Sequence, residues 1–364
     1  MRNRGVNTTT KRRKVLVCGY LNVNLGDDLF FRVLADRYPS VDFYLFSDVD
    51  CTRIVARPNL HTIRRNRINH IFASHLPYQY YFYRFDAIVY IGGSIFMERG
   101  ESGKCTTTRN LRWFNYHFPA TPIHIIGSNY GPEHTPKFRR EVESVLDFVE
   151  SVCFRESYSY EIFRHKPNVS KAADVVFGME LPCGVERDED SVGFSVIDLT
   201  IREELMSYIE RYEQTMSDLI VRHREQGAKV KLFSFCRAEG DVRAMERIVA
   251  RLSEEVASGV EIVSYEGDVD CFLRQLGSVG LLYATRFHAT ILGFLLGIPT
   301  VPVIYSDKTL NVLNDMGWTA PTIDIRNGCE GYENIEAHTL CEECLSALKE
   351  QSINQFTSLD KTLS

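Results

Sequence analysis

Short apolar segments alternate with amphipathic segments along most of this chain. In the first half, apolar runs at 14–19, 86–91, 123–127 and 151–154 each end in a glycine, a polar loop or an arginine. Residues 27–38 have apolar side chains at helical spacing and carboxylates in the first turn. This alternation predicts strands joined by helices, and therefore a parallel sheet built from right-handed crossovers. Further strands are predicted at 42–46 and 60–63, a helix at 135–150, and 173–177 as the segment that closes this half.

The same alternation returns in the second half, after the turn-rich, charged segment Leu181–Asp190, which we interpret as a linker. We expect domains at 14–180 and 191–325, and a C-terminal helix and frayed tail at 326–364. Two such α/β halves, facing each other across a cleft, form a GT-B-like arrangement of two Rossmann-like domains with parallel sheets. Strands are predicted at 192–197, 229–235, 260–264, 280–283 and 300–304, and helices at 201–226, 239–256, 268–276 and 286–297.

Composition narrows the class of protein. A net charge of −6 gives no support for a nucleic-acid partner, and the sequence contains no run of 18 apolar residues that could cross a membrane. Cys18 and Cys153 lie in apolar runs, which favours reduced, buried thiols and a cytoplasmic location. Cys341 and Cys344 form a CxxC pair without a second pair, so we predict no metal site.

The segment 284–293 carries the clearest candidate chemistry. Arg286 and His288 stand two residues apart, where the predicted strand 280–283 ends and a helix begins. Ligands of open α/β sheets bind at the carboxyl ends of the strands and at the helix N-termini that follow. A fixed cation beside a titratable imidazole suits an anionic ligand that must also exchange a proton.

Five other predicted strand ends also carry polar or glycine residues. Four of them have a structural alternative: a helix cap for the two aspartates, a tight turn for the glycines, a surface Arg–Glu pair at 155–156 and a solvated lysine at 308. Both readings stay open at this point. The residues are Asn24, Asp27 and Asp28; Gly92, Gly93 and Ser94; Asn129; Arg155 and Ser157; and Lys308.

Taken in order, these segments resemble the polysaccharide pyruvyl transferase family, over about residues 14–317. The family often has a third glycine where Ser94 stands, aspartate where Glu156 stands and leucine where Phe287 stands. The resemblance rests on Asn-x-Gly-Asp at 24–27, Gly-Gly at 92–93, Gly-Ser-Asn-Tyr-Gly-Pro at 127–132, Phe-Arg-Glu-Ser at 154–157, Ala-Asp-Val-Val-Phe at 173–177, Arg-Phe-His at 286–288 and Tyr-Ser-Asp-Lys at 305–308.

The resemblance implies transfer of a pyruvyl group from phosphoenolpyruvate to two hydroxyls of a sugar in a cell-surface or exopolysaccharide precursor, giving a cyclic ketal. Phosphoenolpyruvate is then a co-substrate, and neither a cofactor nor a metal is expected. The second domain would lie on the donor side and the first on the acceptor side. The roles implied are catalysis for His288, Asp27 and Asp28; donor binding for Arg286, Arg155, Lys308 and Ser157; and acceptor or loop contacts for Asn24, Gly92, Gly93, Ser94 and Asn129.

Two other functions stay open. A GT-B glycosyltransferase that uses a nucleotide sugar would need an acidic residue for the donor ribose, for which Glu266 or Asp307 could serve. A non-catalytic glycan-binding relative would keep the cleft without the reaction.

The aromatic segment 71–85, with Arg64, Arg65 and Arg67 just before it, suits either a peripheral membrane contact near a lipid-linked acceptor or a helix packed on the sheet.

Overall fold

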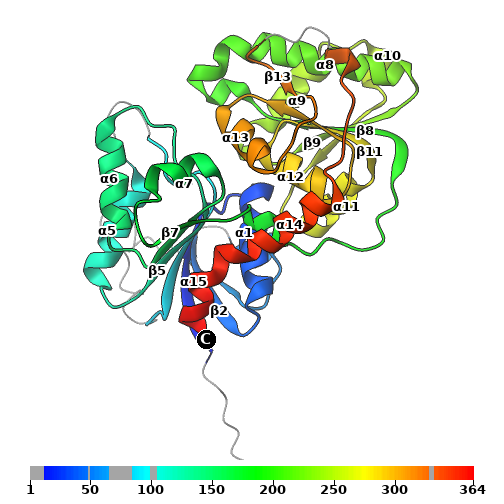
Figure 1. The fold of residues 1–364 in the computed structure, drawn as a ribbon. Coiled ribbons are helices and arrows are strands. Elements are labelled where there is room, and N and C mark those ends of the chain that lie inside the picture. The colour runs from blue at the N-terminus through cyan, green and yellow to red at the C-terminus, as the bar shows by residue number, and fades with distance from the viewer. Residues whose placement is uncertain (1–11, 48–49, 65–83, 99–104, 328–331) are drawn as a thin grey trace, which may run out of the picture.

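The computed structural model describes residues 12–47, 50–64, 84–98, 105–327 and 332–364. Figure 1 shows two units that touch each other, and each is a parallel sheet with helices on both faces. This is the α/β architecture of two Rossmann-like sheets that the sequence predicts. Among the helices in these ranges, none is long and apolar enough to cross a membrane.

The first sheet has the strand order β3-β2-β1-β4-β5-β6-β7, and every pairing is parallel. Its central strands are buried along their length because helices cover both faces, which explains their continuous apolar runs. The bounds are β1 Arg13–Cys18, β2 Val41–Ser47, β3 Leu60–Arg64, β4 Ala87–Ile91, β5 Ile123–Ser128, β6 Ser151–Phe154 and β7 Val169–Lys171.

One first-half prediction needs correction. The segment 173–177, predicted to close this half, contains a 3₁₀ turn, and the strand β7 before it closes the sheet. The helices are α1 Leu25–Arg37, α2 Cys51–Ile54, α5 Thr106–His117, α6 Pro136–Leu146 and α7 Ser157–Phe163, and the 3₁₀ turn is η1 Val175–Gly178.

The second sheet has the order β10-β9-β8-β11-β12-β13, again all parallel. Its first strand already begins at Asp188, inside the predicted linker. The strands are β8 Asp188–Val196, β9 Lys229–Ser234, β10 Val260–Ser264, β11 Val279–Ala284, β12 Thr300–Ile304 and β13 Ile323–Asp324.

The helices of the second unit differ from prediction at three places. The predicted helix 201–226 is α-helical only from Ile209, since 3₁₀ turns precede it. The predicted helix 239–256 is divided into two helices, α9 and α10, and an additional helix follows β12. The helices are α8 Ile209–Glu225, α9 Asp241–Val249, α10 Glu254–Ala257, α11 Val269–Gly277, α12 Phe287–Leu295 and α13 Asp307–Asp315.

The C-terminal segment returns to the first unit (Figure 1, red). It comprises α14 Glu342–Ile353, the 3₁₀ turn η6 Asn354–Phe356 and α15 Thr357–Leu363. The expected fraying of the last residues is wrong, because Phe356 and Leu359 are buried in the core that includes β1 and α1. Asp360 also accepts hydrogen bonds from Arg37 (2.6 Å) and Tyr38 (2.6 Å).

The sequence had indicated reduced cysteines in the core, and this does not hold for all of them. Cys341 and Cys344 form a disulfide at the start of α14, and Cys183 and Cys271 are exposed free thiols. Cys51, Cys105, Cys153 and Cys236 are buried and form no disulfide with another described residue. Position alone could not reveal the pairing, because a CxxC at a helix start suits a disulfide, a metal site or two thiols.

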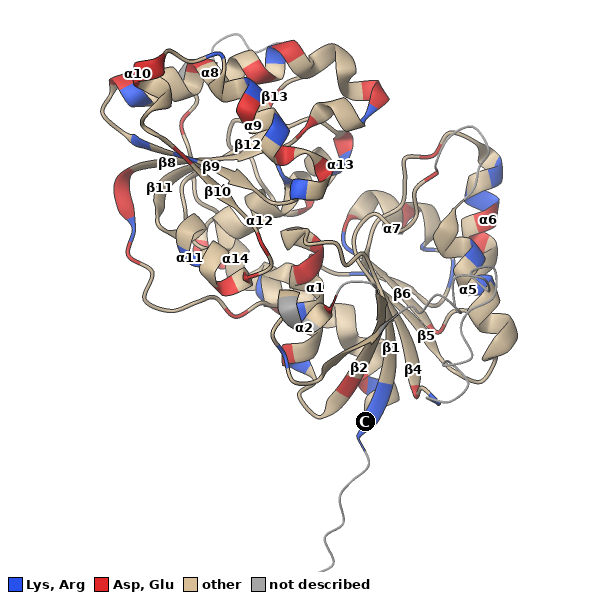
Figure 2. Cartoon of the chain, turned by 180° about the vertical axis from the view of Figure 1, so that it is seen from behind, with Lys and Arg blue, Asp and Glu red and all other residues tan. Residues whose placement is uncertain are grey.

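The two units touch along α1. The backbone N–H of Leu25 donates to the carbonyl of Phe235 (3.0 Å), Arg32 pairs with Asp270 (2.7 Å), and α1 packs against α11. In Figure 2, α1 and α12 lie next to each other at this junction. The carboxyl ends of both sheets therefore face the same region.

Candidate active site between the two sheets

The predicted site residues come from strand ends of both sheets. Gly93 and Ser94 follow β4, Asn129 follows β5 and Arg155 follows β6. From the second unit, His288 lies in the first turn of α12 and Lys308 in the first turn of α13. The contacts described below bring these six residues into one group, which we call the Arg155 group.

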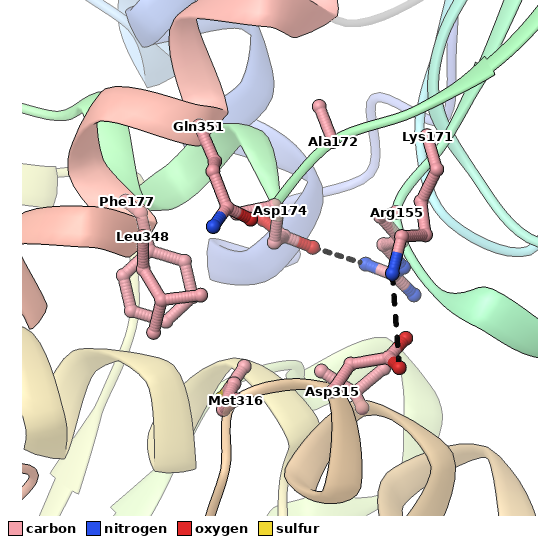
Figure 3. Close-up of a pocket in the computed structure, with 11 residues that line it drawn as sticks. Arg155, Lys171, Ala172, Asp174, Phe177, Asp315, Met316, Leu348 and Gln351 are labelled. Carbon is pink, nitrogen blue, oxygen red and sulfur yellow. Dashed lines mark hydrogen bonds and ion pairs between the residues drawn. The ribbon is translucent and has the colours of Figure 1, made fainter. Parts of the chain in front are cut away.

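Arg155 is the centre of this group. Its Nη1 donates to Asp174 Oδ2 (2.7 Å) and its Nη2 to Asn129 Oδ1 (3.0 Å), and only 3% of the residue is exposed. The guanidinium lies 4.3 Å from the centroid of the Phe287 ring, which belongs to the second unit. Gly93 permits this position, because a β-carbon there would overlap the guanidinium. Figure 3 shows the pair with Asp174.

His288 reaches across the junction into the first unit. Its Nε2 lies 3.5 Å from Arg155 Nη1 and 4.0 Å from Asp174 Oδ2, and its ring meets Phe30 edge-on at 5.4 Å. A β-carbon on Gly26 would overlap the imidazole, so a glycine is required there.

The charge state of His288 differs from the sequence-based expectation. Burial lowers the pKa of this imidazole to about 3, although the Asp174 carboxylate acts in the opposite direction. The expected titration near neutrality therefore does not hold for the protein without a ligand, in which His288 is neutral.

Lys308 is the second cation of the group. Its Nζ donates to Ser94 Oγ (2.5 Å) and lies 5.6 Å from the Phe287 ring centroid. Burial lowers the Lys308 pKa well below its usual range, and the positive charges of Arg155 and Arg202 add to the effect. Phe287 thus lies against two cations, Arg155 and Lys308, and an anion beside them would offset their mutual repulsion.

Asp27 and Asp28 occupy different environments. Neither caps α1, because the side chain of Asn24 accepts the cap hydrogen bond from the N–H of Gly26 (3.2 Å). Asp27 is half-buried, and burial followed by the charge of Glu239 raises its pKa to about 7. The charges of Lys308 and Arg155 act on it in the opposite direction, so it adjoins the Arg155 group.

Asp28 lies deeper, in the contact between the two units. It is fully buried, and its Oδ2 accepts a hydrogen bond from the hydroxyl of Tyr265 (2.9 Å). Burial raises the Asp28 pKa to about 8, and Oδ1 has no hydrogen-bond partner among the described residues. At neutral pH this carboxyl is therefore mostly protonated.

Arg286 is bound by carboxylates of its own unit. Its Nε donates to Asp241 Oδ2 (3.2 Å), its Nη2 donates to Asp241 Oδ1 and its Nη1 donates to Glu239. Burial would lower the Arg286 pKa, but the two carboxylates outweigh it and raise the pKa. Glu239 also accepts from Asn24 Nδ2 (3.2 Å), which links this second group to the first unit. The donor role predicted for Arg286 stays a prediction.

Ser157 lies at a contact between α7 and α13. Its N–H donates to Asp315, and its hydroxyl accepts from Lys171 Nζ (2.7 Å). Lys171 and Asp315 border a small crevice between the two units and α14, shown in Figure 3. Glu156, not Ser157, caps α7, and with Arg155 it is buried, so the surface-pair reading of 155–156 is wrong.

The two acidic residues considered for a donor ribose, Glu266 and Asp307, form ion pairs with arginines outside the Arg155 group. Glu266 is exposed and lies 3.4 Å from Arg237, and Asp307 is exposed and pairs with Arg326 (2.6 Å). Among the described residues, no three His, Cys, Asp or Glu side chains are grouped as metal ligands would be. Most of the aromatic segment 71–85 lies outside the described residues, as do Arg65 and Arg67.

Sequence reasoning gave no role to four residues that complete the site. Asp174 holds Arg155, the ring of Phe287 faces both cations, and Glu239 and Asp241 hold Arg286. Two of these acids were visible signals in the sequence, because Asp174 lies in the segment 173–177 and Asp241 near the start of the predicted helix 239–256.

Comparison with known proteins identifies the family of this chain. A family model for polysaccharide pyruvyl transferase matches residues 24–307. The amylovoran biosynthesis protein AmsJ of Erwinia amylovora is 23% identical over 280 residues, which cover 68% of this chain and 63% of AmsJ. The chain thus spans less than two thirds of that relative's length.

The fold also resembles solved structures. HepE of Anabaena, in complex with UDP and glucose, has a TM-score of 0.58 at 11% identity, with 97% of this chain and 99% of HepE covered. A putative UDP-N-acetylglucosamine 2-epimerase of Listeria monocytogenes has a TM-score of 0.53 at 10% identity, with 97% and 91% covered. At such identities the likeness concerns the fold, which is the GT-B-like arrangement of two Rossmann-like domains. The family model for polysaccharide pyruvyl transferase covers well over half of this chain, and the chain therefore belongs to that family.

Proposed function

We propose that this protein transfers a pyruvyl group from phosphoenolpyruvate to two hydroxyls of a sugar in a polysaccharide precursor. Family membership supports the reaction class, and AmsJ is a protein of polysaccharide biosynthesis. The observation that carries the proposal is the Arg155 group, in which two cations from different units share one partly buried aromatic ring.

The donor carries a carboxylate and a phosphate, and the Arg155 group offers one cation for each. Arg155 suits a planar carboxylate, because its guanidinium forks two N–H groups toward one anion. Lys308 suits the phosphate as a point charge. Because the two cations come from different units, donor binding would also hold the units together.

The reaction moves two protons. The enol carbon of the donor is attacked by the two sugar hydroxyls in turn, and the bond to the phosphate oxygen breaks. One hydroxyl proton ends on the donor's methylene carbon, which becomes the methyl group, and the other leaves with phosphate.

Two groups at the site can carry those protons. His288 is neutral in the free protein and so is ready to accept a hydroxyl proton, while the nearby donor anion favours the imidazolium that forms. Asp27 has a pKa of about 7, which suits an acid that gives and regains a proton near neutrality.

An assay of phosphate release tests the proposal. The protein is incubated with phosphoenolpyruvate and a panel of oligosaccharide acceptors, and phosphate is followed by ³¹P NMR while the glycan is weighed by mass spectrometry. We expect release of phosphate only with a suitable acceptor, together with a ketal-modified glycan. Release of nucleotide from UDP- or GDP-sugars, with phosphoenolpyruvate inert, would instead establish a glycosyltransferase.

A further inference from the structure

Gln355, in the C-terminal turn η6, is buried beneath the strand ends that carry the Arg155 group. Only 3% of this residue is exposed. Its Nε2 donates to the carbonyls of Ala173 (3.0 Å), Ala172 (3.2 Å) and, more weakly, Phe154 (3.4 Å), and its Oε1 accepts from the N–H of Gly127 (2.9 Å).

These backbone groups lie at irregular places in the sheet. The pairing of β5 with β6 skips one residue between Ile126 and Ser128, so Gly127 forms a bulge, with φ at +71°. A bulge leaves its extra residue outside the ladder, and the Gly127 N–H would be an unsatisfied buried donor without Gln355. The carbonyls of Ala172 and Ala173 lie beyond the end of β7.

Two of the four contacts immediately precede a residue of the site. Phe154 precedes Arg155, and Ala173 precedes Asp174, which holds the Arg155 guanidinium at 2.7 Å. One side-chain amide thus ties together the two backbone segments on which this ion pair is built. Gln355 would therefore act on the donor through the residues covalently next to its contacts, and not by touching the donor.

We propose that Gln355 is a positioning residue for the Arg155–Asp174 pair and, through it, for donor binding. The inference rests on the proposed function in so far as the donor is phosphoenolpyruvate. It extends the site beyond residues 24–307, the part of the chain that matches the family model.

The chemistry requires a carboxamide of this length. Gly127 needs an acceptor and the carbonyls need a donor, and one amide presents both in a single plane. Glutamate keeps the shape of the side chain but would place an oxygen against the carbonyls, and methionine keeps the approximate length without either function.

The test measures binding of phosphoenolpyruvate alone to the full chain by isothermal titration calorimetry. We expect Gln355→Glu and Gln355→Met to weaken binding by about tenfold, because a small displacement of a positioned cation costs much of its contact. The matched control is Asp360→Asn, which removes a contact of the same C-terminal segment with Arg37 and Tyr38 but none with the site. It should bind the donor as the parent does.

A double-mutant cycle separates positioning from general destabilisation. If Gln355 acts through Arg155, replacing it in an Arg155→Lys background should cost less than about twofold, because coupled residues are not additive. Additive losses, equal losses in Gln355→Glu and Asp360→Asn, or unchanged binding in both Gln355 variants would each overturn the inference.

A second readout keeps the inference separable from the proposed function. If the parent does not bind phosphoenolpyruvate, the proposed function fails, and positioning is judged by hydrogen exchange of peptides covering 153–158 and 172–177. Faster exchange in the Gln355 variants than in Asp360→Asn would sustain it, and equal exchange would refute it.

Discussion

Two buried arginines, one in each unit, each lie between a strand and the helix that follows it, yet their surroundings differ in charge. Arg155 follows β6 and precedes α7, and Arg286 follows β11 and precedes α12. Arg286 has two carboxylate partners, Asp241 and Glu239, whereas Arg155 has one carboxylate partner, Asp174, and lies near the cation Lys308. Arg155 and Lys308 therefore share a deficit of negative charge, while the Arg286 charge is already neutralised. The same residue type thus suits an anion site in one sheet and a structural brace in the other.

The largest effect that this comparison predicts concerns His288, which belongs to the Arg155 group. His288→Ala should lower turnover by about 10²–10⁴, the range for a lost general acid or base, while donor affinity changes little. Steady-state rates of phosphate release, with donor binding measured separately, provide the test. Turnover within a few-fold of the parent would remove His288 from the mechanism.

Matched lysine substitutions test the two arginines directly. Arg155→Lys should weaken phosphoenolpyruvate binding by about tenfold or more, since lysine cannot reproduce the fork. Arg286→Lys should leave binding within about twofold and lower the free energy of unfolding by about 1–3 kcal/mol, because one buried carboxylate loses its partner. Calorimetry and urea unfolding measure both quantities. The opposite pattern would place Arg286 at the donor, as the sequence had indicated.

Proton uptake on donor binding sharpens the contrast further. Burial lowers the His288 pKa to about 3 and the Lys308 pKa well below its usual range, so both hold fewer protons than they would in water. A bound anion raises both pKa values, and the complex therefore takes up protons at neutral pH, so affinity falls as pH rises. Titrations in buffers of different ionisation enthalpy measure this uptake, which His288→Asn should reduce. Proton release on binding would contradict the assignment.

A smaller effect is expected for Asp28, beneath the site. Folding raises its pKa from 3.8 to about 8, so the native state keeps a proton that the unfolded chain loses above pH 4, and stability falls as pH rises toward 8. Below pH 6.5 the lowered His288 pKa gives the opposite slope, so the useful window is pH 6.5–8. Asp28→Asn should raise the free energy of unfolding at pH 8 by about 1–3 kcal/mol. Urea unfolding of the parent and of Asp28→Asn at pH 6.5 and pH 8 tests this. The same pH dependence of the free energy of unfolding in both proteins would count against a raised Asp28 pKa.

Chelation should have no effect on activity. The proposed steps use the arginine, lysine, histidine and aspartate side chains already described, and a phosphate-release assay with excess EDTA checks this. Loss of activity that a divalent cation restores would reassign Asp27 and Asp28 as ligands.

The strand ends were predictable because their chemistry is local. Apolar runs locate the strands, and the polar residue that follows each run, such as Arg155 or His288, lies at the carboxyl edge by construction. The charge balance was not predictable in this way. Whether an arginine meets one carboxylate or two depends on Asp174 and Asp241, which come from other strands and helices.

The C-terminal segment marks the other limit. Residues 350–364 have a weak local pattern, and a frayed tail was the natural expectation. Their order comes from long-range contacts, such as Phe356 in the core and Gln355 at the bulge. The bulge itself is signalled only by Gly127, and its partner lies in a segment far along the chain.

Gln355 also has a consequence for synthesis of the protein. The strands that it joins end at Lys171, whereas Gln355 leaves the ribosome only after the whole second unit has been made. At about 5–20 residues per second, that interval lasts on the order of 10–40 s. During this time the bulge of the nascent first sheet is uncapped, and the core residues that pack with Phe356 lack that partner. We therefore expect the first half to finish folding last, although it is made first.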